Sequence, residues 1–252
     1  MPAAVSKNLL NPYYETWCRL QVNPEAFEYM YNGRRSRLWS DPLLRADLIK
    51  SVARWPLIHR YGFAIPSEEA LQAIAALSPI VEIGAGAGYW AWMLKERGAT
   101  IQAFDPRPVL GNHYRFTNYY SPIAKGDYRR ALKMYPDRTL FVSWPSYSQN
   151  WAAQALRLHK GQYVAYIGEW NGGCTADEEF FALLDYGFKE KQFIELPQWD
   201  GIHDNLWIYE KIPGIDVETL DASFICQQCQ GKVWHGDGWC NNCFRYVEEL
   251  PA

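Results

Sequence analysis

Glycines occupy every second position of a short turn in the stretch VEIGAGAGYW, directly after an apolar run. Because glycine lacks a Cβ, such a turn lets backbone N–H groups approach a ligand closely at the start of a helix. The dinucleotide fingerprint G-x-G-x-x-G would require a further glycine where Tyr89 stands. The turn by itself fits either a cofactor site or a structural role. The turn has the pattern Glu82-x-Gly84-x-Gly86-x-Gly88.

Two more acidic residues follow at regular intervals. Asp105 ends the run TIQAFD, about 20 residues after the turn, where a carboxylate can accept hydrogen bonds from both hydroxyls of a ribose. Asp127 follows the next apolar run, in KGDY. A single Asp of this kind is more often a solvated loop residue or a helix cap. Three acids in order at the ends of three successive predicted strands favour a cofactor site.

This series resembles the first motif of class I S-adenosylmethionine-dependent methyltransferases, which has the form (D/E)-x-G-x-G-x-G. The resemblance covers about residues 65–212 and implies a seven-stranded Rossmann-like fold with a reversed final hairpin. It implies that the glycines pass beneath the methionine end of the cofactor, that Asp105 holds the ribose, and that Asp127 and Tyr128 flank the adenine. The cofactor-binding set that we predict is Glu82, Gly84, Ala85, Gly86, Gly88, Tyr89, Asp105, Pro106, Asp127, Tyr128 and Ser143.

A second motif concerns the methyl acceptor. Trp144-Pro145-Ser146-Tyr147 is similar to the (D/N/S)-P-P-(Y/F) motif with which amino-methylating members of the family hold an –NH2 group and stack a flat ring. It departs from that motif at Trp144 and at Ser146, and Ser143 could replace part of the lost polar function. The same residues fit a turn whose aromatic side chains pack on the sheet. Methyl transfer needs an aligned nucleophile and exclusion of water more than acid–base chemistry.

Two further polar residues are expected near the acceptor. Glu169 lies in a glycine-rich loop, GEWNGG, before a helix that Thr175 can cap, and it suits a contact with a substrate amine. His203 could act as a base, but adjacent residues of an extended hairpin point to opposite faces, so His203 and Asp204 should diverge. A surface histidine is the commoner outcome in a hairpin. The acceptor-side set that we predict is Trp144, Pro145, Tyr147, Glu169 and His203.

Four cysteines near the end of the chain form two Cys-x-x-Cys pairs separated by ten residues. Two such pairs supply the four tetrahedral thiolates that zinc prefers, and a unit this small needs a metal to fold. The unit resembles a zinc ribbon, with no open position for catalysis. Two basic side chains stand against four acidic ones between 221 and 252, which favours packing on the main domain or a protein contact over phosphate binding. The predicted zinc ligands are Cys226, Cys229, Cys240 and Cys243.

The elements that must position these residues alternate along the chain. From residue 79 onward, short apolar runs alternate with helical stretches, which predicts an α/β fold with a doubly wound, mostly parallel sheet. The last two runs, KQFIEL and NLWIYEK, are too close for a helical crossover and should pair antiparallel. We predict a helical N-terminal segment over 1–64, an S-adenosylmethionine-binding Rossmann-like methyltransferase domain over 65–215, and a zinc ribbon over 221–250. Helices are expected over DPLLRADLIKSVARW and, capped by Ser67, over EEALQAIAAL.

Composition narrows the class of protein. The 252 residues carry a net charge of −3 and have no apolar run long enough to span a membrane, so a cytoplasmic protein without membrane contact is expected. We predict an S-adenosylmethionine-dependent methyltransferase acting on a nitrogen of a nucleobase or another planar group. A small-metabolite N- or O-methyltransferase and a catalytically inactive cofactor-binding adaptor are the alternatives. The acceptor is accordingly either nucleic acid or a small molecule, and the ribbon offers a protein contact. The basic stretch NGRRSRLW either contacts phosphates or solvates a loop.

Overall fold

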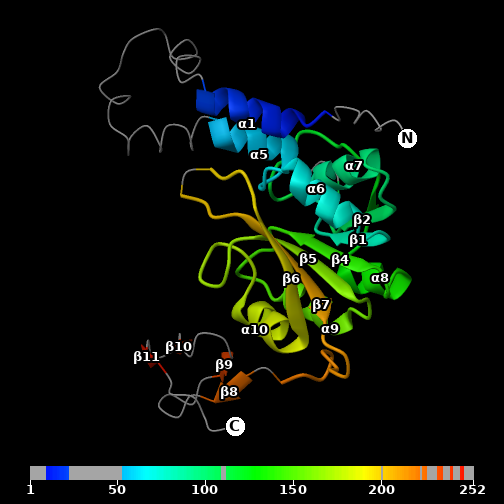
Figure 1. The fold of residues 1–252 in the computed structure, drawn as a ribbon, viewed down its shortest axis with the longest axis vertical. Helices are drawn as coiled ribbons and strands as arrows, with labels where there is room; N and C mark the ends of the chain where they lie inside the picture. Colours follow the sequence, from blue (N-terminus) through cyan, green and yellow to red (C-terminus); the bar gives the residue numbers. More distant parts are fainter. Residues whose placement is uncertain are drawn as a thin grey trace, which may run out of the picture.

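A seven-stranded sheet forms the centre of the molecule (Figure 1). The computed structural model describes residues 10–22, 53–108, 112–199, 201–221, 223–225, 232–234, 239–240 and 245–246. The strands of the large sheet are β1 Ile80–Ile83, β2 Ile101–Asp105, β3 Ile123–Lys125, β4 Thr139–Ser143, β5 Tyr163–Gly168, β6 Phe188–Glu195 and β7 Asn205–Lys211. Their order is β3-β2-β1-β4-β5-β7-β6. The first five run parallel and β7 pairs antiparallel with both β5 and β6, so the predicted mixed sheet with a reversed final hairpin is confirmed.

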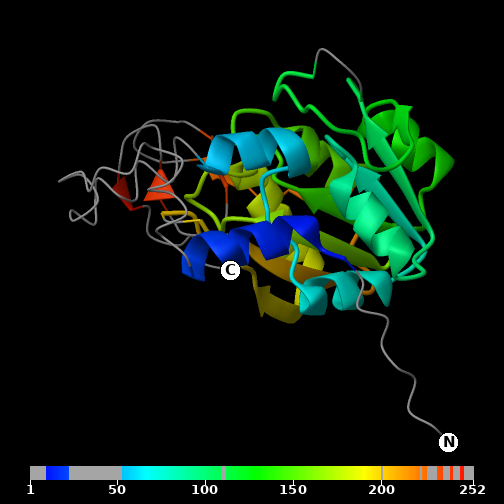
Figure 2. The same cartoon turned by 90° about the horizontal axis from the view of Figure 1, so that it is seen from above.

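Helices cover both faces of this sheet. On one face lie α1 Pro12–Val22, α5 Trp55–Tyr61, α6 Glu68–Ala75 and α7 Tyr89–Glu96; on the other lie α8 Tyr128–Met134, α9 Trp151–Leu158 and α10 Glu178–Gly187. Seen from above in Figure 2, α1 and α5 run close together. Their contact includes the rings of Tyr13 and Tyr61, stacked with centroids 4.9 Å apart. Of the helix expected over 41–55, residues 41–52 lie outside the described ranges.

Short polar side chains begin several of these helices. Ser67 caps α6 as predicted, because its hydroxyl accepts the N–H of Ala70 at 3.1 Å. The expected cap of α10 was wrong: Asp177, rather than Thr175, accepts the N–H of Phe180 at 3.0 Å. The hydroxyl of Thr175 instead bonds inside the preceding loop.

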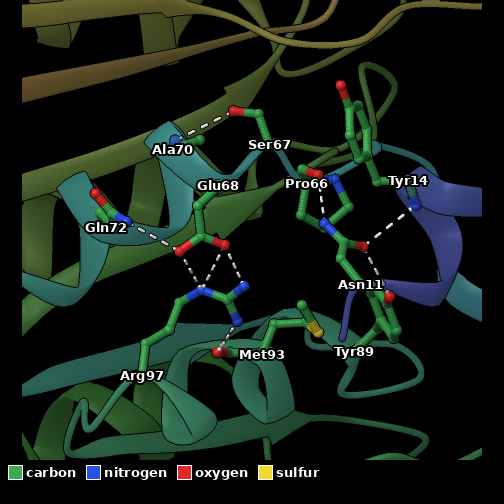
Figure 3. Close-up of polar contacts among 10 residues, drawn as sticks. All are labelled: Asn11, Tyr14, Pro66, Ser67, Glu68, Ala70, Gln72, Tyr89, Met93 and Arg97. Atoms are coloured by element: carbon green, nitrogen blue, oxygen red, sulfur yellow. Dashed lines mark hydrogen bonds and ion pairs between the residues drawn. The ribbon is translucent and has the colours of Figure 1, made fainter. Parts of the chain in front are cut away.

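The helix that follows the glycine turn is tied to the N-terminal helix. The hydroxyl of Tyr89 donates to Asn11 Oδ1 at 3.0 Å, and the Asn11 amide donates to the carbonyl of Pro66 (Figure 3). The same hydroxyl accepts the N–H of Tyr13 at 3.1 Å. An ion pair of Glu68 with Arg97 joins α6 to the end of α7. The glycine turn therefore leads into a helix that is fixed at both ends.

Two short hairpins follow the large sheet. β8 Ser223–Ile225 pairs antiparallel with β9 Lys232–Trp234, and β10 Trp239–Cys240 pairs antiparallel with β11 Arg245–Tyr246. The predicted ligands Cys226, Cys229 and Cys243, and the side chain of Cys240, lie outside the described residues, so the zinc site stays a prediction. Elsewhere in the described ranges, no cluster of three or more metal-binding side chains occurs. The helices within those ranges are too short or too polar to cross a bilayer.

Candidate functional site

A cavity of about 490 Å³ opens at the carboxyl ends of β1, β2 and β4. The chain leaves β1 toward β2 on one side and later returns to β4 on the other, so this is the point of an open α/β sheet where ligands bind. The volume lies in the range of small-molecule sites. The predicted residues that line the cavity are Gly84, Gly86, Asp105, Pro106, Asp127, Tyr128, Ser143 and Trp144.

The glycine turn forms one wall of this cavity in a conformation that other residues avoid. Gly84, Gly86 and Gly88 have φ values of 74°, 54° and 70°. A Cβ on Gly86 would stand 2.7 Å from the ring of Phe116, so the position requires glycine for its space as well as for its backbone angle. The N–H groups of Gly84 and Ala85 donate to the carbonyl of Phe104 and fix the turn to β2.

Asp105 is held in place by this turn. Its Oδ2 accepts the N–H of Gly86 at 3.0 Å and its Oδ1 accepts the N–H of Arg107 at 2.7 Å. Burial raises the pKa of Asp105, and these two N–H groups oppose that rise. Each carboxylate oxygen still has a lone pair to offer. A buried, oriented acceptor thus faces the cavity at the end of β2.

Asp127 and Tyr128 lie on the far side of Asp105. Asp127 caps α8 by accepting the N–H of Arg130 at 3.2 Å, and its other oxygen pairs with Arg129 at 3.0 Å. Tyr128 is buried and carries the Arg129 guanidinium over its ring at 4.7 Å. Asp127 therefore combines the two roles weighed from the sequence, a helix cap and a residue of the cavity wall.

Four residues of the predicted cofactor set do not line the cavity. Glu82 is buried within β1, and its Oε2 meets no hydrogen-bond partner in the described part of the chain. Burial, with the nearby charge of Asp105, raises the pKa of Glu82 to about 8. Tyr89 points into the core toward Asn11, and Gly88 packs against Ile123. Glu82, Ala85, Gly88 and Tyr89 therefore support the turn without lining the cavity.

Trp144 forms the wall opposite the glycine turn. It is not glycine, yet its φ is 53°, a strained value of the kind that gathers at functional sites. Its ring stacks on Phe63 with centroids 4.7 Å apart, and its backbone N–H donates to the carbonyl of Ile167 at 2.8 Å. Pro145 and Tyr147, the neighbours predicted with it, do not line this cavity. Tyr147 is 66% exposed and lies at a shallow groove beside it.

Glu169 and His203 also lie outside the cavity lining. The Glu169 carboxylate accepts the N–H of Cys174 at 2.7 Å and the N–H of His203 at 2.9 Å, which joins the loop after β5 to the β6–β7 hairpin. Although burial alone would raise it, these donors lower the pKa of Glu169. The His203 side chain is exposed whereas Asp204 is buried, so the predicted divergence of this pair is confirmed.

Sequence reasoning missed the loop between β2 and β3 and the aromatic residue before α6. Tyr114 and Phe116 from this loop and Phe63 line the cavity, and Tyr114 shares a hydrogen bond of 2.9 Å with Ser146 across its mouth. The aromatic run HYRFTNYY, placed directly after the predicted ribose acid, was the available signal. Trp151, at the start of α9, was missed as well.

Comparisons with known proteins place these observations beside solved structures. No family model and no curated protein matches the sequence. The chain is similar in structure to magnesium protoporphyrin IX methyltransferase from Synechocystis PCC 6803 with bound SAM, at 12% identity and a TM-score of 0.40, covering 82% of this chain and 100% of that one. A SAM-dependent methyltransferase from Archaeoglobus fulgidus gives 14% identity, a TM-score of 0.43 and coverage of 68% and 100%.

A third similar structure is 1,6-didemethyltoxoflavin-N1-methyltransferase from Burkholderia thailandensis. It has 16% identity and a TM-score of 0.40, with coverage of 83% of this chain and 94% of that one. The similarity to all three is weak in sequence and in superposed backbone.

Proposed function

We propose that this protein is an S-adenosylmethionine-dependent methyltransferase whose cofactor occupies the cavity at the ends of β1, β2 and β4. The observation that carries the proposal is Asp105, a buried carboxylate that the Gly86 N–H orients toward the cavity. A ribose diol offers two hydroxyl donors, and the two oxygens of Asp105 each retain a lone pair for one of them. Hydrogen bonds to a charged acceptor of this kind contribute about 1.5 to 3 kcal/mol.

The rest of the cavity fits the other parts of this cofactor. Gly84 and Gly86 leave room where a side chain would close the space, which suits the methionine end. Asp127 and Tyr128 supply an acceptor and a ring beside the adenine. The bound cofactor would contribute an electrophilic methyl group carried on sulfur.

The residues of the chain have three tasks in such a transfer. They bind the cofactor, align an acceptor and exclude water. Phe63, Trp144 and Tyr114 surround one end of the cavity with aromatic surface, and the bond from Tyr114 to Ser146 closes part of the mouth. These walls suit a flat acceptor such as a nucleobase or another planar ring, with transfer to a nitrogen. A small metabolite would use the same walls.

We also propose the predicted zinc ribbon for the C-terminal region. In the order of the chain, Cys226 and Cys229 come between β8 and β9, Cys240 is the last residue of β10, and Cys243 comes before β11. A hairpin turn is the place where two thiolates reach one ion. Purified protein should contain one zinc per chain by mass spectrometry, and Cys229→Ser should lose it while the large sheet stays folded.

The test of the main proposal is calorimetric titration with S-adenosylmethionine and S-adenosylhomocysteine, with NAD as the control ligand. Micromolar binding of the first two and none of NAD is expected. Absence of binding by both would overturn the cofactor assignment. If binding is present, transfer of a labelled methyl group to RNA, DNA and small planar amines distinguishes an enzyme from a cofactor-binding adaptor that transfers nothing. A salt-dependent affinity for RNA or DNA would favour a nucleic-acid acceptor.

A further inference from the structure

Two carboxylates lie next to one another where β5 and β7 meet, and their hydrogen bonding differs. β5 and β7 pair antiparallel up to Gly168 and Asn205, so Glu169 and Asp204 lie just beyond the last pair. Glu169 is 6% exposed, and each of its oxygens accepts a backbone N–H. Asp204 is 1% exposed, and within the described structure its Oδ1 has no hydrogen-bond partner. Glu169 is engaged in holding a loop, whereas Asp204 retains an unused acceptor.

One unused donor near Asp204 is the indole of Trp144. Its Nε1 is also buried and has no hydrogen-bond partner among the described residues. The indole N–H nevertheless lies close enough to the Asp204 carboxyl to lower its pKa against the larger rise caused by burial. An unsatisfied buried donor beside an unsatisfied buried acceptor is costly unless the two bond to each other.

Arg54 completes this cluster from the side of α5. Its guanidinium lies 5.9 Å from the centroid of the Trp144 ring, and its Nε is buried with no hydrogen-bond partner among the described residues. Trp144 thus stacks on Phe63 and lies next to two charged groups, Arg54 and Asp204, each of which has one buried polar atom without a partner among the described residues. These contacts offset the cost of its left-handed backbone.

We propose that Asp204 is a positioning residue of this site: its carboxylate accepts the indole N–H of Trp144 and so fixes the ring that forms the aromatic wall of the cavity. That this wall faces a methyl acceptor rests on the proposed function. The acceptor class it would position is a flat ring stacked against Trp144 and Phe63. His203, the residue that the sequence favoured in this hairpin, points away.

Ionisation of Asp204 controls the strength of this contact. Burial raises the pKa of Asp204 to about 7, and the Glu169 charge adds to the rise while Trp144 and Arg54 oppose it. Above that value the carboxylate forms a charge-assisted bond to the indole, and below it the neutral acid is a weaker acceptor. The other titratable side chains that feel its charge are Tyr13, Tyr166 and Cys174.

Indole N–H resonances of the full chain test the proposal. The protein has 12 tryptophans, and Trp144→Phe identifies the resonance of Trp144 by its loss. Between pH 5.5 and 8.5 this resonance should move downfield with a midpoint near 7 in the natural protein. In Asp204→Asn it should stay constant. His203→Asn is the matched control, because it removes the neighbouring imidazole and should leave the titration intact.

The outcomes separate this proposal from the cofactor assignment. A Trp144 resonance that does not titrate in the natural protein, that still titrates in Asp204→Asn, or that stops titrating in His203→Asn would overturn it. If Asp204→Asn does not fold, the natural protein and His203→Asn decide alone. Calorimetry with S-adenosylhomocysteine on the natural protein tests the proposed function separately, since the indole titration requires no cofactor.

Discussion

The two ends of the seven-stranded sheet differ in how most of their polar side chains are bonded, although each holds a buried atom without a partner among the described residues, such as His159 Nδ1 at one end and Asp204 Oδ1 at the other. Where the strands begin, Thr139 donates its hydroxyl to the carbonyl of Leu77 at 2.7 Å, and Ser78 accepts the N–H of Thr100 at 2.8 Å. Where the strands end, Asp204 Oδ1 and Trp144 Nε1 are buried without partners in the described structure. The strained backbone of Trp144 and of the glycine turn lies at this same end.

This difference indicates where the fold stores its stability and where it keeps unused bonding capacity. Satisfied hydrogen bonds where the strands begin stabilise the sheet, whereas the open acceptor of Asp204 and the left-handed backbone of Trp144 at the other end cost free energy. Substitutions away from the cavity should therefore change the free energy of unfolding and leave ligand affinity intact. Substitutions at the cavity should change affinity first.

The largest effect is expected from the contact between α9 and α10, away from the cavity. Arg157 pairs with Glu179 at 2.8 Å, both side chains being largely buried, and also donates to the carbonyl of Leu220. Arg157→Met would leave the Glu179 carboxylate without its counter-charge and should lower the free energy of unfolding by about 2 to 3 kcal/mol. Urea unfolding measures this. Affinity for S-adenosylhomocysteine should stay within twofold, and a large loss of affinity in a folded variant would contradict the separation of the two ends.

Asp105→Ala is expected to produce the reverse pattern. It removes the acceptor that faces the cavity and the partner of the Gly86 N–H, so affinity for S-adenosylhomocysteine should fall by about 2 kcal/mol, roughly 30-fold. Calorimetry measures the change. The matched control is Asp137→Ala, an exposed acid next to the start of β4 that should leave affinity unchanged. Equal affinities in the two variants would remove Asp105 from the site.

Gly86→Ala should produce a smaller change in stability that is coupled to binding. A left-handed φ of 54° costs a non-glycine residue about 1 to 2 kcal/mol, and the new Cβ would meet Phe116 at the cavity wall. Gly98→Ala is the matched control, since its φ is 83° but no atom lies within 4 Å of the new Cβ. Both variants should lose stability in thermal unfolding. Gly86→Ala alone should lose ligand affinity, and a similar loss in Gly98→Ala would show that backbone strain rather than the cavity is responsible.

The sequence predicts the α/β class of the fold and the cofactor side of the site, but not the aromatic residues of the cavity wall that come from distant segments. The mostly parallel sheet and its antiparallel final pair follow from alternating apolar runs and from the short connection before NLWIYEK, which are local properties, whereas the strand order came only from the structure. Asp105 and the glycine turn were found because their chemistry is tied to fixed positions at strand ends. The cavity residues Tyr114 and Phe63 were not, because only the folded chain brings a loop and a distant segment to one wall.

The orientation of single side chains was the least predictable feature. Glu169 was expected to face the acceptor, but its oxygens accept the backbone N–H groups of Cys174 in the same loop and of His203 in the distant hairpin. Tyr89 follows the glycine turn directly, yet the helical geometry turns it toward Asn11 in the core. Such outcomes depend on long-range partners that no local pattern contains. The divergence of His203 and Asp204, in contrast, followed from strand alternation, although alternation did not tell which of the two faces inward.

The two ends should also respond to pH in opposite directions. Burial raises the pKa of Glu82, next to the glycine turn, from its ordinary value of 4.5 to about 8. Folded Glu82 keeps a proton that the unfolded chain loses above 4.5, so stability falls as pH rises toward 8. Where β5 begins, burial lowers the pKa of His159 from 6.5 to about 4. The unfolded chain binds this proton first, so stability falls as pH drops below 6.5.

Substitution of each group should remove one of these slopes. Glu82→Gln should abolish the loss of stability between pH 7 and 8, about 1 kcal/mol in the natural protein, because one pH unit of titration corresponds to about 1.4 kcal/mol. His159→Gln should act only between about pH 4 and 6.5. Urea unfolding of both variants over this range measures the slopes. If Glu82→Gln also reduced the loss of stability at acid pH that is assigned to His159, the two groups would interact, and the two ends would not be electrostatically independent. Independent slopes would mean that Glu82 at the ligand-binding end can change its ionisation without changing what His159 at the other end contributes to the free energy of unfolding.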